Sequence, residues 1–182
     1  MKSDLTAFLA LTISFTNFVR PGNVTNLTLE EFNVVINEGK TIWSVKVKEH
    51  KTKNTHGSGF IHMTASTFKL MNCYRKFFRE GRIKHFFINR NGEQYSTPVL
   101  LSITKHLWNK CKVSDVEYAF GKVRHCIVSY IHTHNPEFKE PLAQQMLHSS
   151  KTASKYYRDL LTTKESQINF LKIHEELRKK QL

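Results

Sequence analysis

The chain has 182 residues, of which 40% are hydrophobic and 24% are charged. These values are typical of one folded domain, or one domain with a small addition, and they exclude a disordered chain. Lysine and arginine number 28 against 15 acidic residues, which gives a formal net charge of +13. Such an excess favours a polyanionic partner, most often nucleic acid, with an anionic lipid surface as the alternative.

Cysteine usage and the N-terminal residues indicate the compartment. Cys73, Cys111 and Cys126 are widely spaced and form no metal-binding pair, which predicts reduced thiols inside a cell and no zinc site. Glycosylation sequons begin at Asn23 and Asn26, but residues 1–15 do not read as a signal peptide, so we expect neither to be used. No apolar run is long enough to span a membrane, and we expect no membrane association.

The first half of the chain predicts a buried helix followed by a hairpin. Apolar residues are dense over 5–18, a helix that we expect to stop at Pro21 and Gly22, and a second short helical piece covers 27–32. Residues 42–48 alternate apolar and polar side chains, as a half-buried strand does, and residues 60–64 form the expected partner. The basic loop between them is the expected exposed tip.

The second half predicts helices. Residues 65–80 form an amphipathic helix, residues 86–88 a short apolar run that a turn at 91–92 ends, and residues 97–110 a helix with Pro98 in its first turn. A capping box at 114–117 predicts a helix through about residue 132. Further helices are expected at 137–147, 150–160 and 164–182. The fold class is therefore α+β, mainly α-helical with a small antiparallel β-sheet.

Several residues have the chemistry of phosphate binding, although each has an ordinary alternative. Arg20 could cap the end of the preceding helix, and the loop lysines Lys51 and Lys53 could be solvated charges. Arg124 lies among apolar neighbours at the edge of a buried face, where an arginine needs a carboxylate or a ligand anion as its partner. The choice stays open for each of these residues alone.

A histidine and a tyrosine stand nine residues apart near the C-terminal end. His148 could be a helix cap, and Tyr156 and Tyr157 could be core residues. As a set with two arginines and a lysine, they match phosphoryl transfer: two guanidinium groups and an imidazole hold the phosphate oxygens, a lysine protonates the leaving oxygen and a phenol attacks. This set needs no metal and no cofactor.

The order and the local sequence of these motifs resemble those of the catalytic domain of tyrosine recombinases, the phage integrase family. Residues 18–32 (FVRPGNVTNLTLEEF) are similar to the family's first arginine box, and residues 49–53 (EHKTK) to the hairpin that holds its lysine. Residues 142–157 (LAQQMLHSSKTASKYY) are the closest match, with the family's His-to-Tyr spacing. The wording is nearer to eukaryotic transposon-borne members, such as Crypton-type elements, than to bacterial ones.

The resemblance implies a role for each matching residue. Tyr157 would be the nucleophile, with Lys51 chosen over Lys53 as the general acid. Arg20, Arg124 and His148 would hold the phosphate. The residues expected to contact DNA are Lys53, Lys122, His125 and Lys151.

The chain departs from the family pattern at two positions. Gly121 stands three residues before Arg124, where the family has a histidine, which puts proton handling in doubt or leaves it to Lys122 or His125. Asn23 stands where an acidic residue is frequent. Residues 1–162 would form the catalytic domain. The core-binding domain that normally precedes it is expected to be absent.

The resemblance also implies partners. Double-stranded DNA would be the substrate, cut through a 3′-phosphotyrosine intermediate by a dimer or tetramer. Residues 163–182 form an amphipathic helix that could dock on a neighbouring protomer or fold back on its own domain. We expect the nucleus as the location for a eukaryotic protein, and otherwise the cytoplasm or nucleoid.

Two other functions fit the same residues. A domesticated DNA-binding module would keep the fold and lose catalysis, and Gly121 is the best support for it. A DNA relaxing enzyme of the type IB topoisomerase kind uses a similar set of groups, and would act as a monomer without paired sites.

Overall fold

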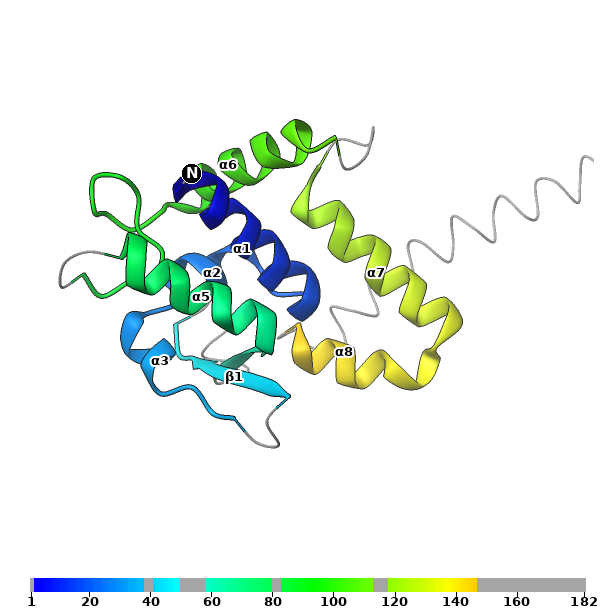
Figure 1. Cartoon of the computed structure of the whole chain (residues 1–182). Helices are drawn as coiled ribbons and strands as arrows, with labels where there is room; N and C mark the ends of the chain where they lie inside the picture. The colour runs from blue at the N-terminus through cyan, green and yellow to red at the C-terminus, as the bar shows by residue number, and fades with distance from the viewer. Residues whose placement is uncertain (1, 38–40, 50–57, 80–82, 113–117, 147–182) are drawn as a thin grey trace, which may run out of the picture.

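The computed structural model describes residues 2–37, 41–49, 58–79, 83–112 and 118–146. Its elements are α1 (Lys2–Asn17), α2 (Pro21–Asn26), α3 (Leu29–Asn33), β1 (Ile42–Val47), β2 (Gly59–Thr64), α5 (Ala65–Phe78), α6 (Thr97–Lys110), α7 (Phe120–His134), the 3-10 turn η1 (Pro136–Phe138) and α8 (Lys139–Gln145). The predicted class is confirmed: the described chain is mainly helical with a small antiparallel sheet (Figure 1).

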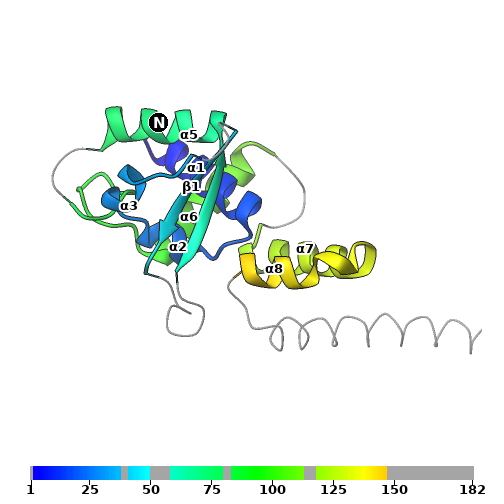
Figure 2. The same cartoon turned by 90° about the horizontal axis from the view of Figure 1, so that it is seen from below.

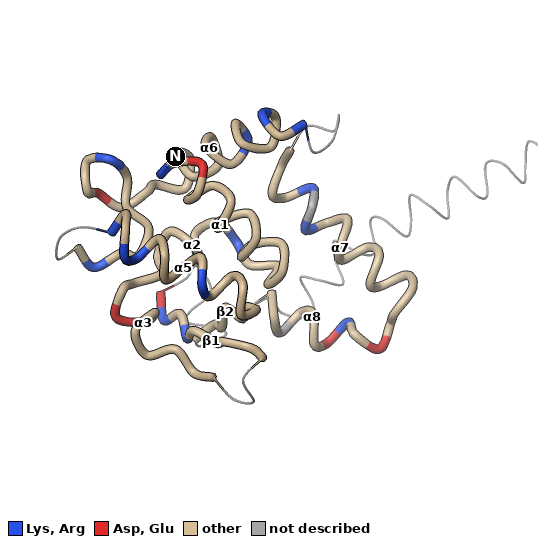
Figure 3. Tube along the Cα trace, in the orientation of Figure 1, with Lys and Arg blue, Asp and Glu red and all other residues tan. Residues whose placement is uncertain are grey.

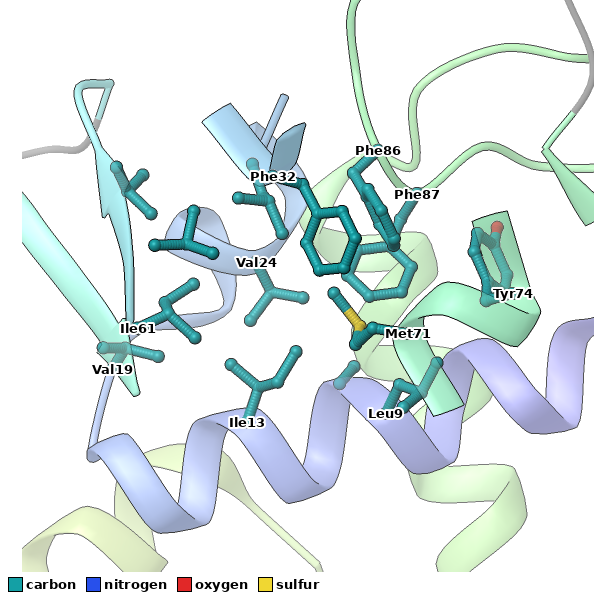
Figure 4. Packing of buried hydrophobic residues seen from close by; sticks show 14 of the residues in the cluster. Leu9, Ile13, Val19, Val24, Phe32, Ile61, Met71, Tyr74, Phe86 and Phe87 are labelled. Atoms are coloured by element: carbon teal, nitrogen blue, oxygen red, sulfur yellow. The ribbon is translucent and has the colours of Figure 1, made fainter. Parts of the chain in front are cut away.

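Strands β1 and β2 form the predicted hairpin, whose tip lies outside the described residues. They pair antiparallel with Val45 opposite Ile61, and the alternate side chains of both strands are buried. Those buried side chains face a core that α1 and α5 also contribute to, and Figure 4 shows Ile61 of β2, Ile13 of α1 and Met71 of α5 within the same cluster. The two-residue period of the sequence therefore separates a core face of the sheet from an outer face.

Aromatic residues dominate the main core. Tyr74 of α5 packs against Phe86 and Phe87, and Phe86 packs against Phe32 with 4.5 Å between the ring centres (Figure 4). The buried Tyr74 hydroxyl donates to the carbonyl of Ile88 at 3.2 Å and accepts from its N–H at 3.3 Å. This pairing fixes the apolar run at 86–88, which ends in the predicted turn with Gly92 at φ 81°.

A second, smaller aromatic cluster attaches α7 to the rest of the fold. Phe15 of α1 and Trp108 of α6 meet Tyr118 and Phe120, and the Trp108 and Tyr118 rings are 5.1 Å apart. Helices α7 and α8 lie to one side of the molecule in Figures 1 and 2. The cluster thus holds the start of α7 at a defined place beside α1 and α6.

Helix α1 ends before Pro21, as expected, but Pro21 and Gly22 also begin α2, because proline is preorganised for the first helical turn. Two other expected boundaries were wrong. Helix α7 begins at Phe120 rather than at residue 114, since Ala119 is extended and the side chains of both its neighbours are buried in the aromatic cluster. The helix expected at 137–147 is the turn η1 followed by α8, which ends at Gln145.

Glu31 joins the first helices to the hairpin. Its carboxylate accepts from the N–H of Thr28 at 2.9 Å, which completes a capping box on α3, and from the N–H of Lys48 at 2.8 Å. Lys48 follows β1 directly, so one buried carboxylate sets where the strand leaves the core. The lysine-bearing loop starts from that point.

Replacing Glu31 by glutamine should destabilise the fold by about 1–3 kcal/mol, because an amide keeps one acceptor oxygen and turns a donor toward a buried N–H. Urea unfolding monitored by circular dichroism measures the change. Glu30→Gln is the matched control, since Glu30 is exposed in the same turn and should change stability by less than about 0.5 kcal/mol. Equal losses in both variants would contradict the buried role of Glu31.

Candidate active site

Arg20 is placed by a sharp turn between α1 and α2. Phe18 has a left-handed backbone with φ 56°, which is uncommon for a non-glycine residue and turns the chain out of α1. Arg20 then takes the N-cap position of α2 in an extended conformation, and its carbonyl accepts from the N–H of Asn23 at 2.9 Å. The alternative of a cap at the end of α1 is therefore wrong, because Arg20 starts the next helix.

Asn17 connects this turn to the sheet and to α8. Its buried amide donates to the carbonyl of His62 at 2.9 Å and accepts from the N–H of the same residue at 2.6 Å. The side-chain amide of Gln145 donates to the Asn17 Oδ1 atom at 3.4 Å. Helix α1, strand β2 and helix α8 thus meet at Asn17, three residues before Arg20 in the sequence. The sequence did not reveal this role, because a lone asparagine near a helix end is common.

Arg124 lies on α7 close to Arg20. Burial lowers the pKa of the Arg124 guanidinium from 12.5 to about 10, and the nearby positive charge of Arg20 adds to the shift. The structure therefore brings together two of the predicted phosphate-binding residues, which lie far apart in the sequence. Two like charges held this close favour a ligand with negative charge beside them.

The other predicted residues of α7 are exposed. Lys122 and His125 lie on either side of Arg124 in the sequence, and both are exposed. Gly121 lies in the first turn of the helix, and a Cβ atom built there meets nothing within 4 Å. The position that holds a histidine in the resembling family therefore has room for a side chain.

The remaining predicted site residues lie outside the described part of the chain. They are Lys51, Lys53, His148, Lys151, Tyr156 and Tyr157. Two described residues lie three positions before Lys51 and His148 and are held by hydrogen bonds. The Lys48 N–H donates to the Glu31 carboxylate, and the Gln145 amide donates to Asn17. Their roles stay predictions.

Other kinds of site find no support in the described ranges. Among these residues no group of three or more histidine, cysteine or acidic side chains is arranged to hold a metal ion. All three cysteines are exposed and free. Within the same ranges, no helix has the length and apolar character needed to cross a membrane. Figure 3 shows lysine and arginine spread over most elements.

A divalent anion should stabilise the protein through Arg20 and Arg124. Sulfate should raise the melting temperature by about 2–4 °C over sodium chloride of equal ionic strength, which corresponds to roughly 1 kcal/mol. Arg124→Met should lose most of this gain in differential scanning fluorimetry.

Sulfate also stabilises proteins generally, so a second variant is needed. Arg90→Met removes an exposed arginine from a loop and should keep the full gain. If sulfate raises the melting temperatures of Arg90→Met and Arg124→Met by the same amount, Arg20 and Arg124 do not form an anion site.

No protein-family model matches the chain, and no curated protein matches its sequence. Solved structures do match. The chain is similar to XerH site-specific recombinase bound to difH substrate in a pre-cleavage complex, with a TM-score of 0.65 and 14% identity over 85% of this chain and 43% of that one. The post-cleavage complex of XerH with palindromic difH substrate has a TM-score of 0.66 and 13% identity over 94% of this chain and 47% of that one.

The Tn1549 transposon integrase, in complex with transposon right end DNA, has a TM-score of 0.57 and 15% identity over 89% of this chain and 58% of that one. At these identities the likeness establishes the fold, which is the tyrosine recombinase catalytic-domain fold. The chain spans about half the length of the XerH chains that it matches.

Proposed function

We propose that this chain is the catalytic part of a tyrosine recombinase that breaks and rejoins double-stranded DNA. The observation that supports this most is the pair Arg20 and Arg124, which are near enough for their charges to interact within a fold that site-specific recombinases share. Their charges suit a phosphate that gains negative charge on its equatorial oxygens during transfer. The net charge of +13 suits a DNA partner.

The proposed reaction proceeds by two balanced steps. The Tyr157 oxygen bonds to the phosphorus and gives up its phenolic proton to solvent, while the bond to the 5′ oxygen breaks and Lys51 gives a proton to that leaving oxygen. Arg20, Arg124 and His148 hold the non-bridging oxygens throughout. The 5′-hydroxyl of another strand then attacks the phosphotyrosine and gives its proton to Lys51, while the bond between the phosphorus and the Tyr157 oxygen breaks and the phenol regains a proton from solvent. The phosphodiester energy is therefore kept, and the proposed set needs neither ATP nor a metal.

DNA contacts and assembly complete the proposal. The residues that would contact the phosphate backbone are Lys53, Lys122, His125 and Lys151. Of these, Lys122 and His125 lie in the described part of the chain, where both are exposed on α7. Residues 163–182 would dock on a neighbouring protomer, which gives a dimer or tetramer on DNA. We propose the nucleus as the location for a eukaryotic protein of transposon origin.

Gly121 favours one second candidate, a DNA-binding module that has lost catalysis. A glycine supplies no group for proton handling, and a Cβ atom built on Gly121 meets no described atom from elsewhere in the chain within 4 Å. Such a module would keep the arginine pair as a phosphate contact and would bind DNA without cutting it. Trapping the covalent intermediate separates the two functions.

A pool of nicked duplexes that release a short 5′-hydroxyl strand should trap the wild-type protein as a covalent adduct, visible on a denaturing gel. Tyr157→Phe should abolish the adduct, because it removes the attacking oxygen. Tyr156→Phe is the control and should keep it. If Tyr156→Phe loses the adduct instead, the assignment of the nucleophile is wrong. Duplex binding by the wild type without any adduct would favour the module.

Restoring a histidine at position 121 should raise the rate of adduct formation by at least about tenfold, since a positioned imidazole supports proton transfer. Gly121→Ala is the matched control, because it adds helix propensity without a titratable group. The measurement is the single-turnover rate of adduct formation by each variant. If the two variants form the adduct at equal rates, any increase over the wild-type rate comes from a more stable helix and not from the imidazole.

A further inference from the structure

The outer face of the β1–β2 sheet has an unusual set of side chains. Strand alternation buries Ile61 and Met63 and leaves Phe60 and His62 on the opposite, exposed face. Phe60 is 40% exposed, although a phenylalanine normally packs into a core.

The two rings are held in a fixed geometry. The Phe60 and His62 planes are nearly parallel, at 9°, with 6.1 Å between their centres. Ser44, directly opposite His62 on β1, places its hydroxyl 2.8 Å from the imidazole Nδ1 atom. The backbone of His62 is also held by Asn17, whose amide donates to the His62 carbonyl and accepts from the His62 N–H. The exposed rings therefore need little ordering when a flat ligand binds.

The surroundings of these rings are basic. Lys46 is exposed and lies directly opposite Phe60 in the strand register, and Lys48 continues the same side of β1. None of the outward-facing residues of the described strands is acidic. The first acidic residue after β1 is Glu49, two residues past the end of the strand. A flat apolar ring beside a lysine is the arrangement that proteins use to bind an unpaired base and its phosphate.

We propose that this sheet face binds single-stranded nucleic acid, with an unpaired base stacked on Phe60 and a phosphate beside Lys46. Paired bases in a duplex are already stacked on their neighbours and cannot use the ring. The use of this site during strand exchange rests on the function proposed above, since exchange unpairs nucleotides near the cut. Binding of a single strand itself does not depend on cleavage.

The test compares a short oligothymidylate with an abasic deoxyribose chain of the same length and charge, by fluorescence anisotropy. Wild type should bind oligothymidylate more tightly than the abasic chain. Phe60→Leu should weaken oligothymidylate binding about tenfold and leave the abasic chain and a duplex unchanged. Lys46→Gln should instead weaken both single-stranded probes equally.

Two further variants keep the test decisive. Phe77→Leu alters a phenylalanine that is 64% exposed on α5, and it should leave all three affinities unchanged. Phe60→Trp should keep the preference, with its fluorescence quenched by oligothymidylate and not by the abasic chain. Equal wild-type affinity for both single strands, or an equal loss of duplex binding in Phe60→Leu, would overturn the proposal. A base preference in a protein that forms no adduct would overturn the proposed catalysis alone.

Discussion

The buried amide of Asn17 is the interaction on which the arrangement of this fold depends most. It ends α1, binds both backbone groups of His62 on β2, and meets Gln145 at the end of α8. A buried backbone N–H and carbonyl left without partners would cost several kcal/mol in total, on the order of 1–3 kcal/mol each. The left-handed turn at Phe18 follows directly, so the position of Arg20 is set from a point where three elements are already fixed together.

The arginine pair shows that the structure holds charge at a cost to stability. Burial and the charge of Arg20 both lower the pKa of Arg124, so keeping this guanidinium protonated carries a cost in the folded protein. Because the folded protein binds the Arg124 proton less tightly than the unfolded chain, the contribution of this one group to stability rises with pH above about 10, where the folded group loses its proton. The aromatic cluster of Phe15, Trp108, Tyr118 and Phe120 packs the start of α7 against α1 and α6, so protein contacts place this helix.

Local patterns in the sequence predicted what depends on neighbouring residues. Alternation over 42–48 and 60–64 predicted the hairpin, and Pro98 predicted the start of α6, which runs over Thr97–Lys110. The features that the sequence missed depend on tertiary contacts. The start of α7 depends on aromatic packing against α1 and α6. The role of Asn17 depends on contacts with His62 and Gln145, which are 45 and 128 positions away in the sequence. The closeness of Arg20 and Arg124 was expected from the family resemblance, since no spacing rule brings two such distant residues together.

The alternation of buried and exposed residues fixes the composition of both faces of the sheet. Burying Ile61 and Met63 requires that Phe60, His62 and the opposite residues of β1 face outward, whatever they are. Polar residues at those positions would satisfy folding equally well, so folding alone does not explain an exposed phenylalanine beside a fixed imidazole and a lysine. His62 and Arg20 are also both placed relative to Asn17, one through hydrogen bonds and the other through three residues of chain. A movement of β2 against α1 would therefore shift the outer sheet face and the arginine pair relative to each other, which links the two proposed sites through one side chain.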